Sequence, residues 1–178
     1  MANDVPGGPG WVIRGDDLRP AITDLEAFRA GMRDDPLAGA VELLWSGRPA
    51  EADVLLAQQD PSVRVRALRA DCRRDRGDAA GAVHDYDALV RECTGTAWEA
   101  VMRQHRGKAL LATGAAQAAL VEFERALALR TAAGAGDDLL ASSRQAVDVA
   151  RETVARQTAA RSAIDAGLPG GDRTTAAS

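Results

Sequence analysis

One segment concentrates positive charge that could recognise an acidic partner. Residues 61–76 hold six arginines and two aspartates, and four of the arginines share one face of a helix: Arg66, Arg69, Arg73 and Arg76. Guanidinium groups bind carboxylates through two parallel hydrogen bonds, so this face predicts a rail for acidic groups. The simpler alternative, which we favour, is a solvated face paired with nearby aspartates. No aromatic residue lies between these arginines, which disfavours a nucleic-acid partner.

Residues that could bind a metal or attack a substrate are few and poorly spaced. The only cysteines and histidines are 9 to 12 residues apart, at Cys72, His84, Cys93 and His105. Zinc sites typically use much shorter ligand spacings. The chain has neither a Gly-x-Ser-x-Gly motif nor a phosphate-binding glycine loop followed by Lys-Ser/Thr. We therefore expect no cofactor, no metal and no enzymatic activity.

Composition favours a single helical domain. The chain has 178 residues and a net charge of −4, and alanine, the best helix former, makes up about a fifth of it. Aromatic residues account for only 3%, too few for a typical β-sandwich core. No apolar run approaches the ~20 residues that span a membrane, and two cysteines are too few for a disulfide framework. We expect a cytoplasmic protein with no membrane or nucleic-acid partner.

Caps and glycine breaks divide the chain into segments. Residues 1–10 are expected to form a flexible leader, residues 11–164 one helical domain and residues 165–178 a disordered tail. A first helix is expected from Asp16 or Asp17 to about Arg33, with Pro20 in its first turn. No segment predicts a strand.

A spacing repeated three times is the most specific pattern in the chain. Gly47, Gly77 and Gly114 are each followed five residues later by alanine and nine residues later by a large side chain. These partners are Ala52 and Leu56, Ala82 and Tyr86, and Ala119 and Phe123. Glycine permits the left-handed turn between two helices. The small alanine lets the two backbones approach, and the large residue fills the space between neighbouring pairs.

With this spacing the chain resembles the tetratricopeptide repeat family, and small actinobacterial repeat proteins of that type. The steps of 30 and 37 residues between the glycines bracket the 34-residue repeat. The clearest copy runs from Gly107-Lys-Ala-Leu110 through Gly114 to Ala126-Leu127. Repeats are expected at about 36–60, 61–93 and 97–131, followed by a capping helix at about 137–164.

The resemblance implies an all-α fold, a solenoid of about three helix-turn-helix repeats whose first helices line a concave groove for a partner protein or peptide. The family register places nine residues in this groove: Leu44, Trp45, Arg64, Ala67, Asp71, Arg74, Gln104, Lys108 and Leu111. Among them, Leu44, Trp45 and Leu111 would supply apolar contacts. Arg64, Arg74 and Lys108 would orient acidic groups of the partner. The chain lacks asparagine in the repeats, so the two-carboxylate clamp of chaperone-binding members is not expected.

Several alternatives stay open at this point. The chain could self-associate into a homodimer, or form a plain helical bundle with no hollow side. It could also be a small-molecule or regulatory sensor, which an apolar concave pocket closed by the last helix would favour. Trp45 is expected to anchor a partner at the groove edge, whereas Trp98 is expected to fill the core.

Overall fold

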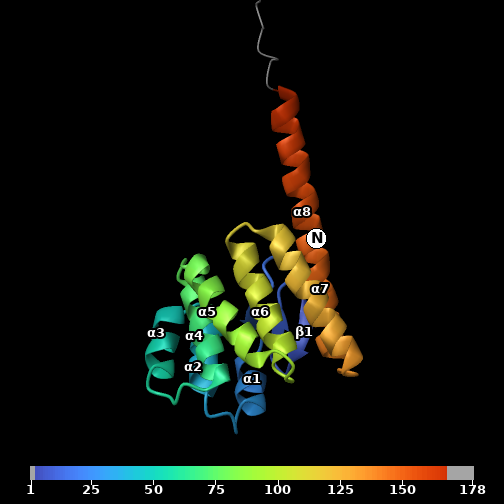
Figure 1. The fold of residues 1–178 in the computed structure, drawn as a ribbon. Coiled ribbons are helices and arrows are strands. Elements are labelled where there is room, and N and C mark those ends of the chain that lie inside the picture. The colour runs from blue at the N-terminus through green and yellow to red at the C-terminus, as the bar shows by residue number, and fades with distance from the viewer. Residues whose placement is uncertain (1–2, 168–178) are drawn as a thin grey trace, which may run out of the picture.

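Eight helices and three short strands make up residues 3–167, the part of the chain that the computed structural model describes (Figure 1). The strands are Val5–Gly8 (β1), Trp11–Ile13 (β2) and Pro20–Ile22 (β3). The helices are Leu25–Gly31 (α1), Ala38–Trp45 (α2), Pro49–Leu56 (α3), Val63–Asp75 (α4), Ala79–Cys93 (α5), Glu99–Ala112 (α6), Ala116–Ala132 (α7) and Asp137–Gly167 (α8). The fold is therefore all-α in class, as expected, with a small sheet at its N-terminal end.

The glycine turns join the helices as the repeated spacing predicts. Gly47, Gly77 and Gly114 have φ of +77°, +97° and +83° and connect α2 to α3, α4 to α5 and α6 to α7. A Cβ at any of these three positions would meet no atom within 4 Å, so their backbone conformation rather than space favours glycine. The alanine and the large residue that follow each glycine are buried in all three pairs.

The helices pack in chain order. From α2 to α8, each helix contacts the next one along the chain, and α4 also contacts α6, which in turn contacts α8. The first helices of the later pairs therefore lie next to one another, with the second helices on the other side of the array (Figure 1). The assignment of this arrangement to a tetratricopeptide superhelix stays a prediction.

The N-terminal region differs most from the expectation. Residues 3–22, here called the arm, form an antiparallel sheet in the order β1-β2-β3, in which Val5 pairs with Ile13 and Trp11 with Ile22. The flexible leader at 1–10 and the helix from Asp16 or Asp17 are thus wrong for these residues. Prolines and glycines break the helical pattern before residue 10, and the apolar run Trp11–Ile13 suits a strand. The first helix, α1, begins only after Asp24, whose side chain accepts a hydrogen bond from the Ala27 amide.

The last helix is longer than its contacts with the body. α8 packs on α6, α7 and β1, whereas its C-terminal part extends beyond the other helices (Figure 1). The expected tail at 165–178 is helical at residues 165–167, and residues 168–178 lie outside the described part. Within residues 3–167, no helix is both long and apolar enough to cross a membrane.

Candidate functional site

The arm covers the face on which the groove was expected. Ile13 and Leu18 belong to the same core cluster as Phe123 of α7 and Val149 of α8. The Gln145 amide of α8 donates hydrogen bonds to the Asn3 carbonyl at 2.8 Å and to the Ile13 carbonyl at 3.3 Å. The blue strands lie behind α6 in Figure 1. The arm is thus an integral part of the packed structure.

Most of the predicted groove residues are buried. Six of the nine are at most 9% exposed, namely Leu44, Ala67, Asp71, Arg74, Gln104 and Lys108. Trp45 and Leu111 are half-buried. An open groove over these residues is therefore not what the structure has, and their role in binding a partner stays a prediction.

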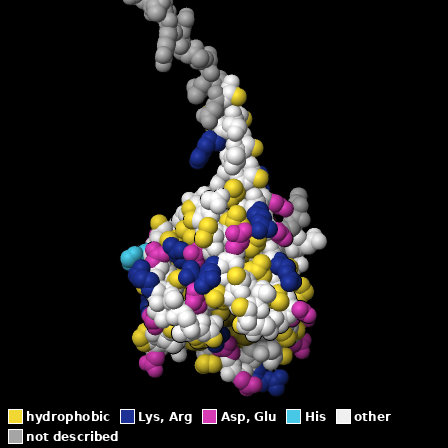
Figure 2. All heavy atoms as spheres, turned by 45° about the vertical axis from the view of Figure 1, so that its right-hand side comes forward, with side chains coloured by type: hydrophobic (Ala, Val, Ile, Leu, Met, Phe, Trp, Pro, Cys, Tyr) yellow, Lys and Arg dark blue, Asp and Glu magenta, His cyan; other side chains and the backbone are white. Residues whose placement is uncertain are grey.

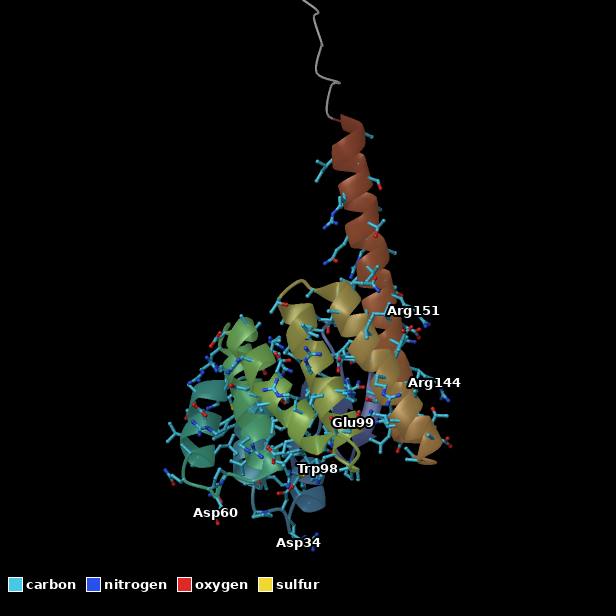
Figure 3. All side chains as sticks on the ribbon, in the orientation of Figure 1. Asp34, Asp60, Trp98, Glu99, Arg144 and Arg151 are labelled. Atoms are coloured by element: carbon cyan, nitrogen blue, oxygen red, sulfur yellow. The ribbon has the colours of Figure 1, made fainter. Side chains whose placement is uncertain are left out.

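Arg64 and the tryptophans have particular surroundings. Arg64 pairs with Asp35 in the loop before α2, with Nη1 2.9 Å from Oδ1, and this pairing lowers the pKa of Asp35. Trp45 packs against Trp11 of the arm, with ring centroids 4.5 Å apart, and against Phe28 at 5.7 Å. Trp98, expected in the core, is 43% exposed at the start of α6 (Figure 3). Because Trp98 lies directly before α6, its ring is not among the buried side chains of that helix.

A buried polar network joins α4, α5 and α6. Asp71 accepts hydrogen bonds from Arg74 Nη1 and the Tyr86 hydroxyl, both at 2.9 Å, and its Oδ2 lies 2.9 Å from His105 Nδ1. The same hydroxyl is 2.7 Å from the Ala67 carbonyl, to which it can alternatively donate its proton. Three predicted groove residues, Ala67, Asp71 and Arg74, therefore meet in one network.

Electrostatic effects in this network oppose one another. Burial alone would raise the pKa of Asp71, but the charge of Arg74 and the neighbouring His105 imidazole outweigh it, so the pKa lies well below its usual value. Burial, followed by the charge of Asp71, raises the pKa of Tyr86 far above its usual value. At neutral pH the network therefore contains an ionised carboxylate and a protonated phenol.

Lys108 differs from its neighbours because nothing binds its ammonium group. Within the described part of the chain, Lys108 makes no side-chain hydrogen bond and no salt bridge, although it is only 9% exposed. Burial, and then the nearby charge of Arg74, lowers its pKa to about 8. Arg130, whose pKa is likewise lowered by burial, donates to the Ser143 hydroxyl at 2.6 Å rather than to a carboxylate.

Two clefts, each of about 390 Å³, open beside the arm. The α2–α4 cleft is lined by Arg14, Arg19, Pro20, Ala21, Leu44, Trp45, Ser46, Gly47, Pro49, Asp71, Arg74 and Asp75. The α6–α8 cleft is lined by Asp16, Asp17, Arg19, Arg74, Lys108, Leu111, Ala112, Val149 and Thr153. Arg19 and Arg74 line both clefts, and Arg19 Nη2 lies 3.3 Å from Asp75. Six of the nine predicted groove residues line one or both of these clefts, and Arg64, Ala67 and Gln104 line neither.

The arginine rail on α4 is paired with acids. Arg66 binds Glu92, Arg69 and Arg76 share Asp53, and Arg73 binds Asp78 and Asp85. These arginines line a cleft of about 490 Å³ that is separate from the arm. Cationic and anionic side chains also alternate over the face drawn in Figure 2. The favoured alternative, a solvated face paired with aspartates, matches this arrangement.

The cysteines are part of the core. Cys72 and Cys93 are buried free thiols, and burial raises the pKa of Cys72 to about 12. In the described range, no three His, Cys, Asp or Glu side chains are placed to hold a metal ion. The buried positions of Cys72 and Cys93 suit packing rather than thiolate chemistry.

Sequence reasoning missed the contribution of the arm to these clefts. Arg19 is expected in the first turn of a helix that starts at Asp16 or Asp17, whereas Arg14, Asp17 and Arg19 line the clefts from a loop. Leu18 in this loop has φ of +59°, which is unusual for a leucine. The available signal was the Trp-Val-Ile run between glycine and proline breaks, which suits a short strand.

Comparison with known proteins gives one partial similarity. A segment of 54 residues, 30% of this chain, is 44% identical to cellulose synthase operon protein C of Salmonella typhimurium. The match covers 5% of that protein, so the chain corresponds to a small part of the curated relative. No family model matches the chain, and no solved structure matches it.

Proposed function

We propose that this chain is a non-catalytic module that binds a partner protein. The Salmonella relative is a tetratricopeptide-repeat-containing protein, which supports a protein-interaction role for the matched segment. Helix pairs of this kind present long, shaped surfaces to a partner. The proposal assigns binding to the side that carries the arm.

The observation that carries the proposal is the lining of the α2–α4 cleft. Leu44, Trp45, Asp71 and Arg74 meet there, so four of the nine predicted groove residues line one hollow. Trp45 is half-buried at its edge, and aromatic side chains of this kind anchor partners at interfaces. The cleft therefore combines an apolar anchor with buried polar groups.

The charges of the cleft favour an acidic group on the partner. Arg14 and Arg19 leave 41% and 42% of their side chains exposed, so each retains N–H donors that face solvent. Arg14 already binds Asp17 through Nε and Nη2, so its Nη1 is the donor that we expect to meet a partner carboxylate. The partner segment we propose carries an aspartate or glutamate beside an apolar residue, the acid meeting Arg14 and Arg19 while the apolar residue packs on Trp45.

The test blocks the mouth of the cleft without touching the core. Ser46 is exposed at the end of α2 and lines the cleft, so Ser46→Trp should fill the entrance and leave the fold intact. Tagged protein is used to capture partners from cells that express it, and captured proteins are quantified by mass spectrometry. We expect the partner recovered by the unmodified protein to fall at least tenfold with Ser46→Trp.

A matched control separates blocking from a general surface effect. Gln58, exposed after α3, does not line the α2–α4 cleft, so Gln58→Trp should recover the same partner in the same amount. Equal recovery by Ser46→Trp and Gln58→Trp would show that the cleft is not the binding surface. If the unmodified protein enriches nothing over bare resin, the proposed interaction role is wrong.

A further inference from the structure

The second hollow, the α6–α8 cleft, has the size and shape of a small-molecule site. Its volume of about 390 Å³ is within the range of roughly 300–1,000 Å³ that ligand pockets show. α6 contributes Lys108 and Leu111, α8 contributes Val149, and the arm contributes Arg19. The walls therefore come from three separate parts of the chain, one of which is the last helix.

Lys108 supplies a cation that no carboxylate binds directly, although the charges of Asp71 and Asp17 act on it. It is the only lysine among 22 basic residues, and more than nine-tenths of it is buried. Within residues 3–167, no side-chain hydrogen bond or salt bridge involves it. Its Nζ is not fully buried, so an oxygen acceptor placed in the cleft can reach the ammonium group.

The carboxylates around Lys108 are already engaged with other groups. Asp71 lies within hydrogen-bond distance of Arg74, Tyr86 and His105. Asp17, which lines the cleft, pairs with Arg14.

Asp16 stands at the rim of the cleft with 78% of its side chain exposed, so water screens its charge. The remaining charges near Lys108 are the cations Arg74, Arg19 and Arg130.

Three of the remaining residues in the cleft wall are apolar, and the fourth, Thr153, donates its hydroxyl to the Val149 carbonyl. Leu111 and Ala112 follow Lys108 along α6, and Val149 faces them from α8. Apolar walls favour an aliphatic group, because burial releases water from both surfaces. Cationic and apolar parts of one small hollow thus define an amphiphilic ligand.

We propose that the α6–α8 cleft binds a small aliphatic carboxylate, whose carboxylate accepts a hydrogen bond from Lys108 and whose tail packs on Leu111 and Val149. This site is additional to the partner surface of the α2–α4 cleft. Its volume favours a tail of a few carbons. The ligand is bound without covalent change.

Isothermal titration calorimetry provides the first test. We expect butyrate and hexanoate to bind saturably to the full chain, and butanol, which lacks the charge, to bind at least tenfold more weakly. Lys108→Met keeps the aliphatic stem and removes the ammonium, so it should weaken butyrate binding at least tenfold. Arg48→Met, on an exposed side chain outside the cleft, is the matched control and should bind as the unmodified protein does.

The single lysine allows a second readout that does not depend on a variant. Protein labelled with 13C-lysine gives one Cε signal, whose pH titration reports Lys108 alone. Saturating butyrate should move the titration midpoint upward by at least one pH unit from its value near 8, because a bound anion stabilises the charged amine.

Each result decides the proposal. Saturable binding with a raised midpoint supports it. The proposal is wrong if butyrate leaves the Lys108 titration midpoint unmoved and calorimetry shows no saturable binding. It is also wrong if Lys108→Met binds butyrate as tightly as the unmodified protein does. Binding of inorganic phosphate with equal or greater affinity than butyrate overturns the assignment to aliphatic carboxylates. Loss of partner capture with Ser46→Trp bears only on the other cleft.

Discussion

Replacing Leu18 with alanine tests whether the arm and the helices fold as one unit. Leu18 is 1% exposed and belongs to the core cluster that contains Ile13, Phe123 and Val147. Truncating a buried leucine to alanine costs about 2–5 kcal/mol of unfolding free energy. The backbone of residue 18 lies in the left-handed region, at φ +59°, where alanine is strained as leucine is. Because the backbone strain is the same in both proteins, nothing offsets the lost burial. We expect Leu18→Ala to lower the unfolding free energy by about 3 kcal/mol.

Replacing Leu18 with glycine instead of alanine tests whether the backbone at this residue is strained. Leu18→Gly loses the same side chain but relieves the left-handed backbone, which costs a non-glycine residue about 1 kcal/mol. We therefore expect Leu18→Gly to be at least as stable as Leu18→Ala, although glycine normally destabilises a folded chain relative to alanine. The reverse order would refute the interpretation that residue 18 is strained.

The assay is urea unfolding followed with two probes. Far-UV circular dichroism reports the helices, and tryptophan fluorescence includes Trp11 and Trp45, which are in contact. Because Leu18 packs against α7 and α8, both midpoints should fall together in Leu18→Ala. If the helical midpoint stays unchanged while the fluorescence changes at lower urea, the arm opens independently and our reasoning about a shared core is wrong.

Two further predictions concern a close approach in the core and the buried network. A Cβ at Gly107 would overlap the ring of Phe123, so Gly107→Ala should lower the unfolding free energy by about 1–3 kcal/mol. Gly39→Ala, in an exposed helical position with ordinary contacts, should be neutral or stabilising by up to ~1 kcal/mol, and urea unfolding compares the two. Asp71 has a pKa below its unfolded value of 3.8, so its contribution is complete above that pH and declines as the pH falls through and below it. Asp71→Asn should therefore flatten the loss of stability between pH 5 and pH 2, measured by urea unfolding at each pH, and an unaltered slope would contradict the pairing.

The helical part could be predicted because its signals are local. Gly47, Gly77 and Gly114 mark turns whose positive φ values follow from steric rules that act within a few residues. Ala52, Ala82 and Ala119 are fully buried, as expected of a small residue where two helices approach. These features depend on sequence neighbours and therefore appear in the sequence itself.

The arm could not be predicted because its structure depends on distant residues. Strands of three or four residues are too short to be stable alone, and β1 to β3 are held by contacts with α2 and α8. Pro20 suits the first turn of a helix, yet it begins β3, because proline is tolerated at both places. The role of the nine predicted residues stays a prediction, and the segment that covers them depends on contacts that local rules do not describe.

The arm also changes what the predicted residues can do. A groove that is open along its length would present Leu44, Arg74 and Lys108 to one extended ligand. With residues 14–19 lying between them, Leu44 and Lys108 line different hollows, and only Arg19 and Arg74 are common to both. Arg19 is held by ion pairs of 3.3 Å to Asp75 and 3.8 Å to Asp17, and partly exposed pairs of this kind are weak. Arg19 and Arg74 therefore form part of the wall of both clefts, and the arm contributes side chains to each.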